Sequence, residues 1–135
     1  MSNKLIRSLY ESRLAGFGLL KSLPIAWENV QFTQPATAYL KSYLLKAPTG
    51  SDDLKGDHRV YEGVYQISVF VPKGQGPQAA ETVAGELAAL FPLNLRLTSG
   101  AFTVQIIEPC SEGPAVQGDT HYMIPVSFKY RADTV

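Results

Sequence analysis

Residues 59–91, RVYEGVYQISVFVPKGQGPQAAETVAGELAALF, contain two different hydrophobic periods joined by a short glycine-containing turn. In the first half, apolar side chains fall on alternate positions, at Tyr61, Tyr65, Ile67, Val69 and Val71, with Gly63 at the position between the two tyrosines. This spacing predicts a strand over residues 59–71 with one buried face. In the second half, apolar residues recur three and four positions apart, which predicts a helix ending at about Phe91, ahead of Pro92.

The turn between these two elements resembles a nucleotide-binding loop at first sight. Gly74, Gly76 and Ala79 fit the G-x-G-x-x-G/A pattern of dinucleotide sites. That pattern also needs a second parallel strand that ends in an acidic residue about twenty residues further on. The next strand ends here in Thr98 and Ser99. We therefore expect the two glycines only to turn the chain from strand into helix.

The rest of the sequence predicts one further helix and four further strands. The helix is expected over residues 3–16, because Gly16 and Gly18 follow its apolar stripe. The strands are expected over residues 36–46, 93–98, 102–106 and 121–131. A Ser99-Gly100 turn predicts a hairpin between the second and third of these strands. Pro125 has no N–H to donate, so the last strand should be an edge strand or carry a bulge there.

This order of elements predicts an α+β fold. We expect a mostly antiparallel sheet of four to five strands with two α-helices packed on one face. A chain of 135 residues suits one domain spanning residues 1–135 with a single core. The polar, glycine-containing segments 47–58 and 109–119 are expected to be loops.

The charge balance excludes some classes of partner. Twelve basic residues cancel twelve acidic ones, which argues against a broad surface for nucleic acid. Apolar runs are too short to span a bilayer, and charged residues interrupt the N-terminal stretch, so neither a membrane segment nor a signal peptide is predicted. We therefore expect an intracellular protein without a nucleic-acid or membrane partner. Cys110 is the single cysteine, so no internal disulfide is possible, and no nucleophile signature surrounds it.

The two histidines are the best candidates for chemistry. His58 follows Asp57, and His121 comes two residues after Asp119. These four side chains would offer metal ligands if their two loops met, but neither spacing matches a recognised ligand pattern. We therefore expect no catalytic residue, no cofactor and no metal. A small metal- or ligand-binding domain built on these histidines is kept as an alternative.

The second face of strand 59–71 is also apolar, through Val60, Val64 and Phe70. Such a patch is rarely left in water, so either residues 24–32 or another copy of the chain should cover it. Both alternatives remain open at this point. The partner-contact candidates combine this face with the charged loop: Tyr39, Tyr43, Val64, Phe70, Asp52, Asp53, Lys55 and Asp57.

Two stretches, residues 24–45 and 60–92, resemble the small tail terminator proteins of phages and prophages that are related to the terminator of lambdoid long-tailed phages. The motifs that carry the resemblance are Ala26-Trp27, Asn29 and Phe32; Tyr61, Gly63, Tyr65 and Gln66; and Val71, Pro72, Gly74 and Gly76. The resemblance extends over most of residues 3–131. These motifs mark structural positions of the family, and none of them contains a catalytic residue.

The resemblance implies a non-enzymatic structural part of a virion tail, present in the host cytoplasm during assembly. Such proteins form a ring, usually a hexamer, on the end of the tail tube. The ring stops the addition of tube subunits and offers a docking surface to the head–tail connector protein. The implied partners are therefore further copies of the chain, the tube protein and the connector. A head–tail joining or neck protein is the alternative within this class.

Overall fold

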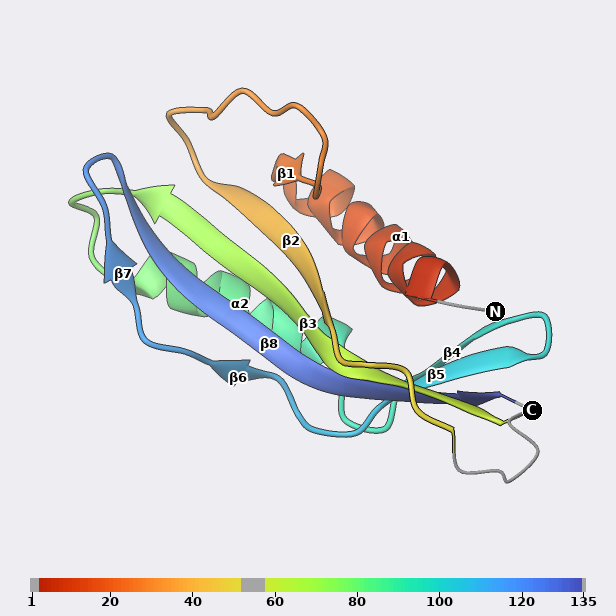
Figure 1. Cartoon of the computed structure of the whole chain (residues 1–135). Helices are drawn as coiled ribbons and strands as arrows, with labels where there is room; N and C mark the ends of the chain where they lie inside the picture. The colour runs from red at the N-terminus through yellow and green to blue at the C-terminus, as the bar shows by residue number, and fades with distance from the viewer. Residues whose placement is uncertain (1–2, 52–57, 135) are drawn as a thin grey trace.

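The computed structural model describes residues 3–51 and 58–134 and has an α+β fold, as predicted (Figure 1). Its elements are α1 (Asn3–Lys21), β1 (Ile25–Ala26), β2 (Tyr39–Lys46), β3 (Arg59–Pro72), α2 (Gln78–Leu90), β4 (Arg96–Ser99), β5 (Phe102–Ile106), β6 (Ser111–Glu112), β7 (Val116–Gln117) and β8 (His121–Thr134). Within this described part of the chain, neither helix is long and apolar enough to cross a membrane.

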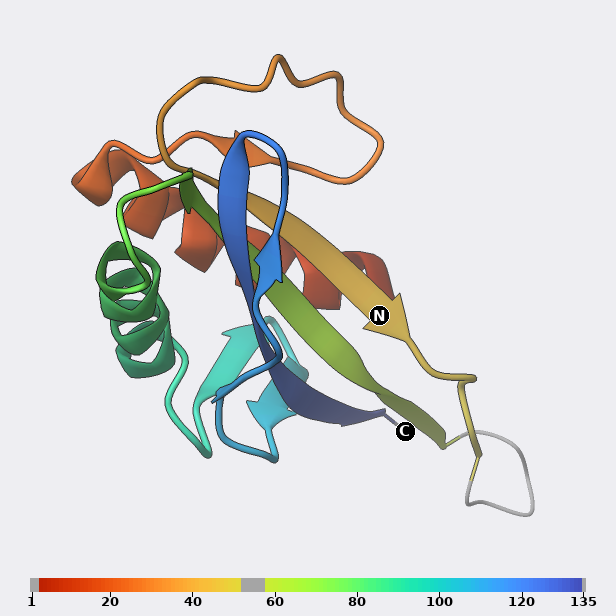
Figure 2. The same cartoon turned by 90° about the vertical axis from the view of Figure 1, so that its left-hand side faces the viewer.

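The strands form one curled, mixed sheet in the order β1-β2-β3-β8-β5-β4, with β6 and β7 pairing with β8 beside this path (Figure 2). All pairs are antiparallel except β1 with β2. The sheet therefore has more strands than the four to five predicted. The additional strands β1, β6 and β7 have two residues each, which is too short for a readable hydrophobic period. The prediction that residues 109–119 form only a loop was wrong for the same reason.

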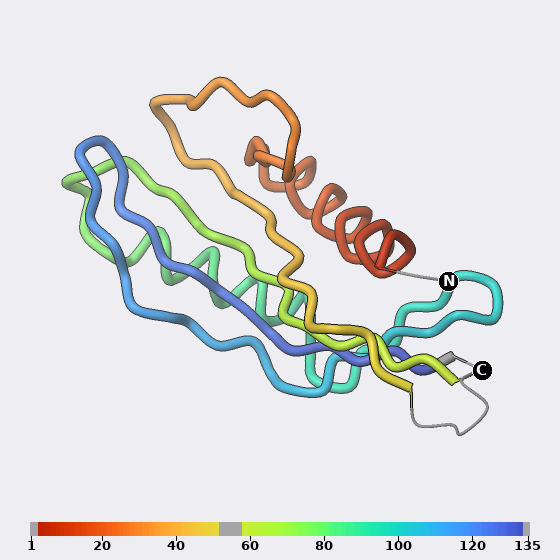
Figure 3. Tube along the Cα trace, in the orientation of Figure 1, coloured from red at the N-terminus to blue at the C-terminus, as the bar shows by residue number. Residues whose placement is uncertain are grey.

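The central ladder joins β3 and β8 along their whole length, from Arg59 opposite Thr134 to Pro72 opposite His121. The Cα trace shows both strands bending together along the length of the molecule (Figure 3). The predicted hairpin of β4 and β5 is confirmed, although β4 begins at Arg96 and leaves Leu93 in the preceding turn.

Pro125 lies in the middle of β8, opposite Ser68 of β3, and the register between these two strands continues through it without a bulge, so the prediction of an edge strand or a bulge there was wrong. Its carbonyl accepts a hydrogen bond from the Gly113 N–H at 2.8 Å, on the side of β8 where β6 and β7 pair. Gly113 falls between these two short strands, and the ladder is interrupted there. The missing N–H of the proline therefore faces a gap in the pairing, which is how the sheet tolerates it.

Helix α1 continues five residues beyond its predicted end and includes Gly16 and Gly18. A Cβ atom on Gly18 would lie 2.7 Å from the Ile25 side chain and 2.9 Å from the Leu23 carbonyl. Gly18 therefore allows the chain that follows the helix to pack closely against it, whereas the sequence pattern had indicated that the helix ends there. The Leu23 N–H donates to the Gly18 carbonyl and closes this return.

Both helices pack on the same face of the sheet, as predicted, and the core lies between them and the strands. Its centre is a group of aromatic side chains from α1, the end of α2, β3 and β8: Tyr10, Phe91, Tyr65, Phe128 and Tyr130. Ring centroids of neighbouring members are 5.1–6.1 Å apart. Such distances suit edge-to-face and tilted packing, which adds to the burial of apolar area.

Candidate interaction surfaces

The structure does not bring the two histidines together. His58 directly precedes β3, whereas His121 pairs with Pro72 at the other end of that strand. A strand of this length separates the two by roughly 40 Å. Among the described residues, no three or more His, Cys, Asp or Glu side chains gather where they could hold a metal ion.

His121 instead holds a surface segment in place. Its Nε2 lies 3.0 Å from the Thr37 carbonyl, and its Nδ1 lies 3.2 Å from the Gln34 side-chain nitrogen and 2.9 Å from the Thr120 hydroxyl. Because a carbonyl only accepts, Nε2 carries the proton in this arrangement and Nδ1 accepts. The ring is 6% exposed. These contacts fasten residues 27–38 to the start of β8.

Cys110 and the glycine turn also have structural roles. Burial raises the pKa of the Cys110 thiol to about 11, and its Sγ lies 3.5 Å from the Phe91 carbonyl. The thiolate is the reactive form, so this cysteine is a poor nucleophile at neutral pH. Gly74 and Gly76 have φ angles of 90° and 76°, which glycine adopts without strain. The helix after them leads to β4, which is not a neighbour of β3, so the parallel unit of a dinucleotide fold is not formed.

The sheet face opposite the helices is partly covered by residues 27–38 (Figure 2). The rings of Tyr39 and Phe70 stack with centroids 4.5 Å apart, and Phe32 packs 5.4 Å from Tyr39. His121 contacts both stacked rings edge-on. Tyr39 is consequently only 2% exposed, and Phe70 is half-buried. At this end of the face, the chain itself supplies the cover.

The other candidates on this face are more open. Tyr43 and Val64 are half-buried, and Val64 lines a groove of about 480 Å³ together with Leu45 and Ile107. Leu45 and Ile107 are exposed. Asp52, Asp53, Lys55 and Asp57 lie outside the described residues, so the charged loop is not placed.

An ion pair fixes the start of the covering segment. The Glu28 carboxylate lies 2.9 Å from the Arg7 guanidinium of α1 and accepts a hydrogen bond of 2.6 Å from the Leu44 N–H of β2. Desolvation by burial raises the pKa of Glu28, but the hydrogen bonds from Leu44 and Arg7 and the nearby charges outweigh it and leave the pKa lowered. One carboxylate therefore links the helix, the covering segment and the outer edge of β2.

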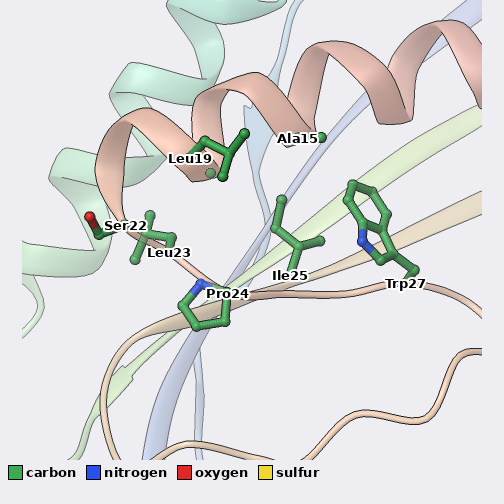
Figure 4. A pocket seen from close by; sticks show the side chains of 8 residues that line it. Ala15, Leu19, Ser22, Leu23, Pro24, Ile25 and Trp27 are labelled. Atoms are coloured by element: carbon green, nitrogen blue, oxygen red, sulfur yellow. The ribbon is translucent and has the colours of Figure 1, made fainter.

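A second groove, of about 550 Å³, lies between the end of α1 and β1 (Figure 4). It is lined by Ala15, Gly18, Leu19, Ser22, Leu23, Pro24, Ile25 and Trp27. Leu19 in this lining is 85% exposed, and the next residue, Leu20, is 79% exposed. Sequence reasoning missed this groove because it ended the helix at residue 16. The signal was present in Leu19-Leu20, two apolar residues next to a predicted chain reversal.

Thus the described surface offers an apolar groove beside α1 and a groove of mixed apolar and charged lining beside the sheet, and exposed apolar surface of this kind is typical of contacts with other chains. The model of the phage tail terminator protein family matches residues 5–130. The chain belongs to this family. A solved structure that is 43% identical superimposes with a TM-score of 0.85, and the alignment covers 100% of this chain and 98% of that one. A search among curated proteins finds no match.

Proposed function

We propose that this protein caps the tail tube: it stops the addition of tube subunits and presents a docking surface to the head–tail connector. The observation that carries this proposal is the family match over nearly the whole chain. The two grooves on the described surface support a role through contacts, and the positions of His58, His121 and Cys110 offer no arrangement for catalysis. In this proposal the protein is not an enzyme.

The capping mechanism is steric. Several copies, six in the family resemblance, form a ring on the last layer of tube subunits. One face of the ring fits the tube, and the other face does not accept a tube subunit. Stable rings of this kind need interfaces on the order of 2,000 Å². Zero formal net charge gives little repulsion between copies, which is compatible with assembly at the tube end.

The direct test is tube growth. Purified tube protein of the same phage is allowed to polymerise with and without this protein, and tube lengths are measured by negative-stain electron microscopy. Capping predicts shorter tubes whose ends carry added density. Tubes of unchanged length despite an excess of the protein would contradict the proposal. Unchanged tubes together with binding to the connector would support a head–tail joining or neck protein in its place.

The charged loop remains a candidate contact with the tube. We expect reversal of charge at Asp52, Asp53, Lys55 and Asp57 to leave the unfolding temperature unchanged while reducing capping, since the polar sequence of this segment predicts little contribution to the core. Normal capping by the fourfold variant would exclude the loop as the contact.

The open part of the sheet face is the second candidate contact. Val64→Lys would place a charge among the apolar residues of the groove, beside Leu45 and Ile107; Lys46, Glu62, Glu108 and Lys129 form its charged part. Reduced capping by a folded Val64→Lys protein would support a contact there. Tyr43→Ala, farther along β2, tests how far the contact extends, whereas Tyr39 and Phe70 are stacked on each other and are less available.

A further inference from the structure

The exposed large apolar residues of the described chain fall into separate groups. Leu19, Leu20 and Val30 flank β1 in the chain, and Leu19 lines the groove between α1 and β1. Val116, which is 53% exposed, lies on β7. The remaining ones, Leu45, Leu93 and Ile107, lie at the other end of the sheet, near β5 and the ends of β2 and α2.

The first two groups occupy opposite edges of the same part of the sheet. Ile25 of β1 pairs with Leu40, Leu40 with Val69, and Val69 with Ile124. Val116 of β7 pairs with Met123, the residue next to Ile124. A single cross-strand row therefore begins at β1 and ends beside β7. Figure 1 shows α1 and β1 on one side of the long strands and β6 and β7 on the other.

Both edges present backbone groups that point outward. The Pro24 carbonyl accepts from the Leu40 N–H, so the N–H and carbonyl of the next residue, Ile25, face away from β2. On the other side, the Gly118 N–H donates to the His121 carbonyl, so the backbone groups of Gln117 face away from β8. Such edges are templates for pairing with another chain.

The directions of the two edge strands also agree with pairing between copies. β1 is parallel to β2, and successive antiparallel pairs lead through β3 and β8 to β7. It follows that β7 runs antiparallel to β1. Two copies placed side by side in the same orientation would therefore bring β7 of one antiparallel to β1 of the other.

The charges of the two sides have opposite signs. Residues 3–28, which contain α1 and β1, have four basic residues and two acidic ones: Lys4, Arg7, Arg13 and Lys21 against Glu11 and Glu28. Residues 108–119, which contain β6 and β7, have three acidic residues and no basic one: Glu108, Glu112 and Asp119. Part of this charge is balanced within the chain, because Arg7 pairs with Glu11 and Glu28, Lys21 with Glu86 of α2, and Glu108 with Lys129. The remaining excess is basic on the first side and acidic on the second, which favours this approach over contact between two identical sides.

We propose that copies of this chain associate head to tail, with the groove between α1 and β1 of one copy receiving β7 and Val116 of the next. Each copy then uses two different surfaces, an arrangement that closes into a ring when the rotation between successive copies adds up to a full turn. Only the location of the ring on a tube rests on the proposed function. The contact itself is a property of the free chain.

The first test is a pair of variants, Leu19→Glu and Val116→Glu, with Leu93→Glu as the matched control. All three residues are exposed, at 85%, 53% and 47%, so the variants should fold. Circular dichroism and thermal unfolding check this. Sedimentation equilibrium over a wide concentration range should show self-association at least tenfold weaker for the first two variants and unchanged for the control.

Mixing the two variants sharpens the test. Leu19→Glu keeps its β7 side intact, and Val116→Glu keeps its groove intact. A head-to-tail contact therefore predicts that an equimolar mixture forms a 1:1 dimer and no larger species in native mass spectrometry. Full-size oligomers in the mixture, or self-association of Leu19→Glu equal to that of Leu93→Glu, would overturn the proposal.

A disulfide trap provides an independent readout. In a Cys110→Ser background, a chain carrying both Leu19→Cys and Val116→Cys should form a ladder of linked copies on mild oxidation in solution. Chains with only one of the two substitutions should stop at dimers. A doubly substituted chain that stays unlinked in solution overturns the proposal. Wild-type protein that self-associates but leaves tube length unregulated would contradict capping and leave this interface standing.

Discussion

Tyr65 and Phe70 lie on the same strand and on opposite faces of the sheet, and the two faces are closed in different ways. Tyr65 is fully buried beneath α1 and among the aromatic rings of the core. Phe70 is half-buried against Tyr39 and His121. Residues 27–38 cover Tyr39 through Phe32 and are held by polar contacts of His121 and Glu28. The helix-covered face is closed by apolar packing of two whole elements, whereas the other face is closed by one segment at a few points. We therefore expect the helix-covered face to dominate the free energy of unfolding, and the face under residues 27–38 to undergo local unfolding first.

The largest expected effect is on the helix-covered face. Phe128→Ala removes a ring that packs against Tyr10, Tyr65 and Phe91, and we expect a loss of about 3–5 kcal/mol in the free energy of unfolding. Urea unfolding followed by circular dichroism measures it. Phe128→Leu, which keeps most of the volume, should lose clearly less. Equal losses for the two substitutions would argue against a tightly packed aromatic core.

A smaller loss is expected on the other face from His121→Ala. The substitution removes the contacts to Thr37 and Gln34, and we expect a loss of about 1–3 kcal/mol. Hydrogen exchange should rise in residues 27–38 and remain low in the β3–β8 ladder. A uniform rise over both regions would show that the two faces are not closed independently.

The ion pair of Glu28 should contribute less than about 1 kcal/mol, because both partners are partly exposed. The pKa of this carboxyl is lowered in the folded protein, so its contribution is present above its ordinary value of 4.5 and is lost as the pH falls through the lowered value. Glu28→Gln should therefore be less stable than the wild type at pH 7 and equally stable at strongly acidic pH. A difference that persists undiminished at acidic pH would assign the effect to packing.

The smallest effect is expected from Tyr10→Phe. Within the described residues, the Tyr10 hydroxyl is buried without a hydrogen-bond partner, and burial raises its pKa far above the ordinary value. Removing a buried, unpaired hydroxyl should change the free energy of unfolding little and can stabilise by up to about 1 kcal/mol. A loss greater than this would reveal a partner of the hydroxyl in solution.

Local periodicity was sufficient to predict the long elements. The faces of β3 follow from alternation within one strand, and the buried side of α2 follows from helical spacing, since both depend only on neighbouring residues. The family motif around Gly63 has a reason that is not local. A Cβ atom there would lie 2.5 Å from the Tyr130 hydroxyl and from the Leu45 carbonyl, and both come from other strands.

The sequence by itself determined the α+β class, the two helices on one face and the identity of the main strands, because hydrophobic periods encode which side of each element is buried. Only the tertiary structure decided the path of the two-residue strands, the position of Pro125 in a central strand and the groove between α1 and β1. These features depend on backbone hydrogen bonds and close approaches between residues far apart in the chain. Such contacts leave no regular spacing in the sequence from which they could be predicted.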